Sequence, residues 1–152
     1  MKTIELGVGN PILQDDGVGI HVINELREHL KDSRVILDIA YTGGMNLLDM
    51  IRGFDKVILV DAIKQEDSKT GEVKRFSLTE APAVHSCNPH DVSLSEALLL
   101  AKQLGEEHLP QEIVVIGIVV KNTVDFGEQL SREVASAVPT AVALVLTELK
   151  NT

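Results

Sequence analysis

The 152-residue sequence has no tryptophan, a single cysteine and only 3% aromatic residues. Its core must therefore be aliphatic, and modules that stack nucleic-acid bases on exposed aromatic side chains are excluded. The lone cysteine, Cys87, cannot form an internal disulfide. Basic residues are also scarce, with 14 against 23 acidic residues and a net charge of −9. Because such a surface repels a phosphate backbone, we expect no nucleic-acid partner.

Long apolar runs are absent as well. The longest, at residues 113–120 and 141–146, are far shorter than the roughly 20 residues needed to cross a bilayer. The first residues do not combine a basic stretch with an apolar one, so we expect no signal peptide, no membrane partner and a cytoplasmic location. A hydrophobic content of 44% and a charged content of 24% fit one globular domain over residues 1–152.

The hydrophobic pattern alternates between strand and helix character. Apolar runs predict strands at 3–8, 34–40, 56–62 and 112–120. Residues 72–78 are predicted to form an edge strand. Helical periodicity predicts helices at 15–30, 44–53, 93–104 and 131–150. The last of these is expected to bend or break at Pro139. This alternation predicts a three-layer αβα domain with a mainly parallel, five-stranded sheet. Ligands of such domains bind at the carboxyl ends of the strands.

The stretch LGVGNPILQDDGVG, residues 6–19, connects the first strand to the first helix. It lacks the third glycine of a dinucleotide-binding G-x-G-x-x-G loop, because Ile12 stands there, and Pro11 removes a backbone donor. Asp15 and Asp16 would also lie where a pyrophosphate docks, so no nucleotide cofactor is expected. Either aspartate can instead cap the helix that follows.

Cys87 has two histidines nearby in the sequence, His85 and His90. A thiolate nucleophile needs such a basic neighbour, but an unreactive cysteine in a loop fits the pattern equally well. The same three residues resemble part of a zinc site, although no fourth ligand is evident.

Asp16, Asp61 and His90 form another candidate, a metal site at the carboxyl edge of the sheet. Two carboxylates and one imidazole neutralise a divalent cation and leave positions open for water or substrate. Asp61 ends an apolar strand, where a charge needs a partner. Each residue also has an ordinary alternative role, as a helix cap, a turn residue or a surface histidine. The residue pattern alone leaves these roles open.

Four segments of the chain closely resemble the hydrogenase maturation endopeptidases, which process the large subunit of [NiFe] hydrogenases. The segments, in the order and spacing of that family, are GVGNPILQDDGVG (7–19), TGGMNLLDMI (42–51), VILVDA (57–62) and PHDVSL (89–94). The similarity extends from Ile4 to Val120. Ile12 replaces the family's usual leucine, and the chain has AYTGGM where D-G-G-T-x-G is more common.

The resemblance implies an endopeptidase that removes a C-terminal extension from a [NiFe] hydrogenase large-subunit precursor after nickel insertion. The nickel would be supplied by the substrate and would serve as the recognition element. The implied catalytic and nickel-contacting residues are Asp16, Asp61 and His90. The implied substrate-binding residues are Gly9, Asn10, Thr42, Gly43 and Gly44. A non-catalytic nickel-binding assembly chaperone is the alternative function.

Overall fold

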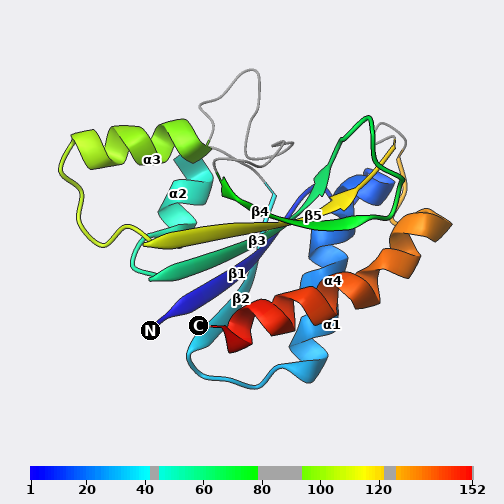
Figure 1. Ribbon diagram of the computed structural model, residues 1–152, viewed down its shortest axis with the longest axis horizontal. Coiled ribbons are helices and arrows are strands. Elements are labelled where there is room, and N and C mark those ends of the chain that lie inside the picture. The colour runs from blue at the N-terminus through cyan, green and yellow to red at the C-terminus, as the bar shows by residue number, and fades with distance from the viewer. Residues whose placement is uncertain (42–44, 79–93, 122–125, 152) are drawn as a thin grey trace.

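The computed structural model describes residues 1–41, 45–78, 94–121 and 126–151 (Figure 1). Five strands form one sheet in the order β2-β1-β3-β5-β4. Their bounds are Thr3–Val8 for β1, Val35–Ala40 for β2, Lys56–Ile63 for β3, Val73–Ser77 for β4 and Glu112–Val119 for β5. Neighbouring strands are parallel except for β4, which is antiparallel to β5 at one edge. The predicted fold class is confirmed.

Helices cover both faces of the sheet (Figure 1). The helices α1 (Val18–His29) and α4 (Arg132–Lys150) pack on one face, and α2 (Met45–Ile51) and α3 (Leu94–Gln103) pack on the other. Side chains alternate along each strand, so each face buries its own aliphatic cluster. We call these surfaces the α1/α4 face and the α2/α3 face. None of the helices in the described part of the chain is long and apolar enough to cross a membrane.

The predicted element bounds are correct to within two residues except at the start of the first helix. That helix begins at Val18, after a short 3-10 turn, η1 (Gln14–Gly17). Its cap position is held by Gly17, so the prediction that Asp15 or Asp16 caps α1 is wrong. Pro139 does not break the last helix, because α4 continues through it to Lys150.

The start of α1 lies unusually close to the sheet. A Cβ atom on Gly19 would collide with the backbone oxygens of Val60 in β3 and Val8 in β1. A Cβ atom on Gly7 would in turn collide with the backbone of Gly19. Because both positions lack a side chain, α1 can rest directly on β1 and β3. This contact fixes η1 at the carboxyl edge of the sheet.

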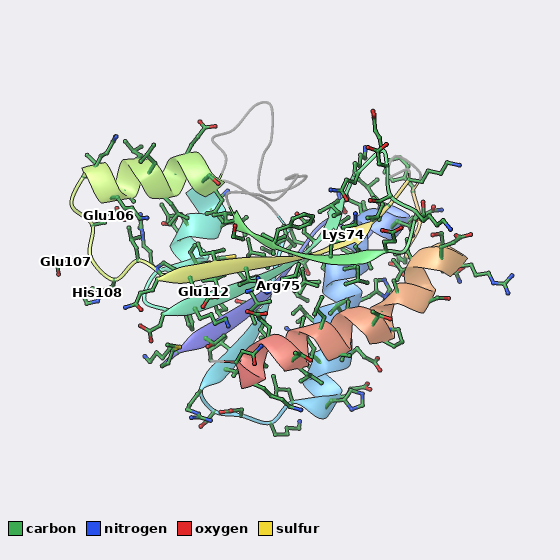
Figure 2. All side chains as sticks on the ribbon, in the orientation of Figure 1. Lys74, Arg75, Glu106, Glu107, His108 and Glu112 are labelled. Atoms are coloured by element: carbon green, nitrogen blue, oxygen red, sulfur yellow. The ribbon has the colours of Figure 1, made fainter. Side chains whose placement is uncertain are left out.

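Glu148, near the end of α4, attaches this helix to the amino edge of the sheet, where the parallel strand β3 begins. Its carboxylate accepts hydrogen bonds from Lys56 Nζ at 3.1 Å and from Arg75 Nε and Nη2 at 2.7 and 2.9 Å. The bonds from Arg75 and Lys56 lower the pKa of Glu148 to about 2, against the opposing effect of burial. Arg75 also approaches Glu112 on the neighbouring strand, at 3.7 Å (Figure 2).

Replacing Glu148 by glutamine should destabilise the fold by about 3–5 kcal/mol at pH 7, because Lys56 would keep a buried charge with a weakened partner. The wild-type advantage should disappear as the pH falls from 4.5 towards 2, where the native carboxylate becomes protonated. Urea unfolding across this pH range measures both effects. The half-exposed Glu112, replaced in the same way, is the matched control and should cost less than about 1 kcal/mol.

Glu5 in β1 is a buried acid that points to the α1/α4 face. It is fully buried, and neither carboxylate oxygen has a hydrogen-bond partner among the described residues. Desolvation raises the pKa of Glu5 from 4.5 to about 8. The side chain is therefore protonated in the folded protein at neutral pH, where the unfolded chain carries it as an anion.

The wild-type protein should lose stability as the pH rises from 4.5 to 8, by up to about 1.4 kcal/mol per pH unit from Glu5 alone. Over this range the unfolded chain releases the Glu5 proton and the folded chain retains it. The variant Glu5→Gln should lack this contribution and gain stability over wild type as the pH increases. Urea unfolding of both proteins at pH 5 and pH 8 measures the difference, and identical pH slopes would contradict the assignment.

Candidate functional site

The two predicted aspartates lie at the carboxyl edge of the sheet. Asp16 belongs to η1 and Asp61 to β3, and these two elements contact each other. Both residues are buried, at 5% and 4% exposure. The free energy of burying a carboxylate at this depth is unfavourable unless charged or hydrogen-bonding partners compensate for the lost water.

Asp16 is positioned by the loop that follows β1. Its Oδ2 atom accepts a hydrogen bond from the backbone N–H of Asn10 at 3.0 Å. A Cβ atom on Gly9 would collide with the backbone oxygen of Asp16, so a glycine is required where the loop passes η1. The side chain of Asn10 closes the loop by accepting the N–H of Ile12 at 3.2 Å. The predicted substrate-binding residues Gly9 and Asn10 therefore lie beside the predicted ligand Asp16.

The neighbouring Asp15 has a different role. Its Oδ1 atom accepts the backbone N–H of Ser131 at 2.6 Å, directly before α4. A carboxylate at this helix terminus is favoured by the positive end of the helix dipole. The paired aspartates thus point to different partners: Asp15 joins η1 to α4, and Asp16 joins η1 to the loop after β1.

Asp61 lies on the α2/α3 side of β3. Val60 and Ala62 both point to the α1/α4 face, so alternation directs the side chain between them to the other face. Its pairing partner on β5 is Gly117, which carries no side chain. The helix α3 packs on this same face and begins at Leu94, four residues after His90 in the sequence.

Several predicted residues lie outside the described part of the chain. They are His90, Thr42, Gly43 and Gly44, together with the alternative nucleophile or zinc-ligand positions His85 and Cys87. Their roles stay predictions. The nickel site as a whole is likewise a prediction, of which the structure describes the two carboxylates.

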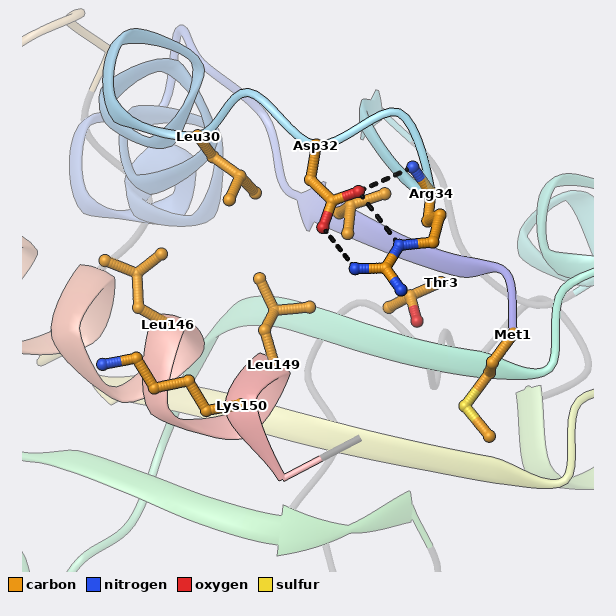
Figure 3. Close-up of a pocket in the computed structure, with 9 residues that line it drawn as sticks. Met1, Thr3, Leu30, Asp32, Arg34, Leu146, Leu149 and Lys150 are labelled. Atoms are coloured by element: carbon orange, nitrogen blue, oxygen red, sulfur yellow. Dashed lines mark hydrogen bonds and ion pairs between the residues drawn. The ribbon is translucent and has the colours of Figure 1, made fainter.

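A groove of about 1060 Å³ opens beside η1 at the carboxyl edge. It is lined by Gln14 and Asp15, by the segment after β3, and by the end of β5 and the start of α4. A smaller cavity of about 400 Å³ lies at the opposite edge, near Met1 and Leu149 (Figure 3). None of the predicted site residues that the structure describes lines either cavity, but the groove includes Gln14 and Asp15 of η1, the element that carries Asp16, and is therefore the better candidate for a ligand path.

The described residues contain one further cluster of metal-ligating side chains, on the exposed face of α1. It consists of Glu25, Glu28 and His29. The His29 Nε2 atom lies 3.5 Å from Glu25 Oε1. All three residues are solvent-exposed, and the cluster is not part of the edge that carries Asp16 and Asp61.

The fold and its edge carboxylates define a three-layer α/β protein of the kind that binds ligands at the carboxyl ends of its strands. The sequence profile of the hydrogenase maturation protease family matches residues 20–148. The hydrogenase 2 maturation protease of Escherichia coli is 30% identical over 123 residues, covering 78% of this chain and 73% of that protein.

Solved structures show the same relationship. The hydrogenase maturating endopeptidase HybD from E. coli aligns with a TM-score of 0.82 and 26% identity, covering 99% of this chain and 93% of that one. The [NiFe] hydrogenase maturation protease HybD from Thermococcus kodakarensis aligns with a TM-score of 0.67 and 27% identity, covering 97% and 98%. The chain belongs to the hydrogenase maturation protease family, which confirms the resemblance noted in the sequence and supports peptide hydrolysis as its activity.

Replacing Asp15 should lower the stability of the fold, because this residue joins η1 to α4. Asp15→Ala should destabilise the fold by about 1.5–3 kcal/mol, the usual value for a hydrogen bond to a charged group. Asp15→Asn, which keeps an acceptor oxygen, should lose less. Chemical unfolding measures both losses. An Asp15→Ala protein as stable as wild type would show that the Ser131 contact does not hold α4 in place.

Proposed function

We propose that the protein is an endopeptidase that removes the C-terminal extension of a [NiFe] hydrogenase large-subunit precursor after nickel insertion. The observation that carries this proposal is the placement of Asp16 and Asp61, both buried, on contacting elements at the carboxyl edge of a maturation-protease fold. The named relatives are hydrogenase maturation proteases, which supports the precursor as partner.

The proposed site would recognise nickel that the precursor carries. Two carboxylates and an imidazole suit a divalent transition ion, because the imidazole favours nickel or zinc over magnesium. Asp16 and Asp61 would supply the carboxylates and His90 the imidazole. These three ligands leave positions that the precursor's own groups can occupy. The nickel is thus part of the substrate, and no resident metal or nucleotide is needed.

Hydrolysis needs a base that takes a proton from the attacking water. We assign this role to Asp16 or Asp61, which makes the activity of the aspartyl type. The Asn10 N–H donates to Asp16 Oδ2, which supports this role because a hydrogen-bonded carboxylate keeps one orientation. Precursor-borne nickel would supply Lewis acidity and a fixed reference point for the scissile bond.

The substrate peptide would approach along the carboxyl edge. The loop of Gly9 and Asn10 lies beside Asp16. The Gly9 N–H donates to the carbonyl oxygen of Ala40, the last residue of β2, at 3.1 Å, and residues 42–44 follow β2 in the sequence. The groove of about 1060 Å³ beside η1 is large enough for a peptide segment. We therefore propose Gly9, Asn10 and residues 42–44 as peptide-binding positions.

The variants Asp16→Asn, Asp61→Asn and His90→Ala should each reduce precursor processing by at least about 100-fold, because each removes a proposed nickel contact. Cleavage is followed by mass spectrometry as loss of the extension, with nickel-loaded and nickel-free precursor compared. Wild type should cut the nickel-loaded form alone.

Asp38→Asn and His108→Ala are matched controls, because both side chains are exposed and neither is a proposed ligand. Both should process precursor at the wild-type rate. Unimpaired cleavage by two of the three site variants would remove the proposed site. Precursor binding without any cleavage would favour the assembly chaperone, and cleavage of unrelated peptides would favour a general peptidase.

A further inference from the structure

Three large hydrophobic residues of the described chain are exposed at the carboxyl edge of the sheet: Tyr41 directly after β2, and two residues near η1. Ile12, in the loop after β1, is 50% exposed, and Phe126, before α4, is 79% exposed. Phe126 has the largest exposed fraction among the large hydrophobic residues of the described chain, and it is one of three phenylalanines in the whole sequence. A soluble protein exposes a phenylalanine this fully at a cost in hydration free energy.

Backbone hydrogen bonds join the loop of Ile12 to Gly127, the residue after Phe126. The N–H of Gly127 donates to the Ile12 carbonyl oxygen at 2.8 Å, and the N–H of Gln14 donates to the Gly127 carbonyl oxygen at 2.8 Å. Phe126 is bonded directly to Gly127, so its position is set by the loop that carries Ile12. We call the two side chains the Ile12–Phe126 pair.

The loop under the pair is closed by backbone hydrogen bonds and is locally strained. Gln14 has a φ of 46°, a left-handed conformation that disfavours residues other than glycine. Its side chain lies against Gly127, where a Cβ atom would be only 3.1 Å from Gln14 Cγ. The Asn10 carbonyl accepts the Leu13 N–H at 3.2 Å, which closes the turn that presents Ile12. The pair is therefore displayed on an ordered support.

The same loop also carries the proposed nickel contact. Asn10 precedes Ile12 by two residues and holds Asp16 through its backbone N–H. Any protein that covers the Ile12–Phe126 pair is thereby placed at a fixed distance from the Asp16 carboxylate. Aromatic side chains are enriched in protein–protein interfaces, so a partner that reaches Asp16 has Phe126 available for contact on the neighbouring segment.

We propose that the Ile12–Phe126 pair docks into an apolar hollow on the hydrogenase large-subunit precursor and so places the bond to be cut at Asp16. This inference rests on the proposed function, because the precursor is the protein that must reach this edge. The pair acts in positioning and not in the chemical step. Its loss should therefore raise the KM for precursor and leave kcat nearly unchanged.

The test measures affinity and cleavage separately. The dissociation constant of nickel-free large-subunit precursor, which the proposed activity does not cut, is measured for wild type, Ile12→Ser and Phe126→Ser. Each variant should bind at least about tenfold more weakly, as expected for an apolar anchor at the centre of an interface. With nickel-loaded precursor, KM should rise by a similar factor. Because both side chains are exposed, the melting temperatures should stay near that of wild type.

Leu104→Ser is the matched control. Leu104 is 71% exposed and follows α3, which ends at the left of Figure 1, whereas β5 ends and α4 begins at the right. Its affinity for precursor should stay within about twofold of wild type. An equal loss with Leu104→Ser, or no loss with Phe126→Ser, would overturn the inference.

Two further outcomes would overturn it as well. One is a wild-type dimer that dissociates on Phe126→Ser, because the pair would then be covered by a second copy of the chain. The other is a wild-type protein that does not bind precursor at all. If wild type binds precursor but cleaves neither form, the proposed function fails, and the affinities of the variants still decide whether the pair docks.

Discussion

The close contact between the start of α1 and the sheet determines the rest of the carboxyl edge. Gly19 rests on the backbone oxygens of Val60 and Val8, where no side chain fits, and Gly9 rests on the backbone of Asp16 in the same way. These contacts leave little freedom to the chain between β1 and α1. As a result η1 lies against β3, and the short stretch from Gly9 to Asp16 holds one proposed nickel contact, two proposed peptide-binding residues and one exposed apolar side chain.

The second constraint is the attachment of α4 at both of its ends. Asp15 binds the backbone before its first turn, and Glu148 binds Lys56 and Arg75 near its last turn. These charged contacts lie at opposite edges of the sheet, so α4 cannot slide along the α1/α4 face. Since η1 supplies Asp15, the helix and the candidate site share one support. Asp15 thus holds α4 in place directly beside Asp16, the candidate for chemistry.

The sequence predicted most of the fold because its information is local. The apolar run at residues 56–62 indicates a strand buried on both faces, and β3 is buried throughout. It could not assign the two aspartates, because the partner of Asp15 is 116 residues away in the chain. The burial of Glu5 and Lys56 was likewise invisible, since charged residues at strand positions usually face solvent. The one indication of Phe126 in the sequence is that it is a lone aromatic residue in a polar segment. Its exposure could not be predicted, because it depends on how this segment packs against the loop after β1.

Under the proposed function, a protease of 152 residues must select one hydrogenase precursor through few contacts. In the proposed arrangement, Ile12 and Asp16 belong to one hydrogen-bonded loop, so partner docking and nickel recognition are mechanically connected. A precursor that docks without nickel would leave two buried carboxylates without the cation that they share. A nickel-bearing peptide that lacks the apolar hollow would bind the carboxylates, but its scissile bond would not be positioned at Asp16. The fixed spacing of the two proposed contacts would confine cleavage to a substrate that satisfies both.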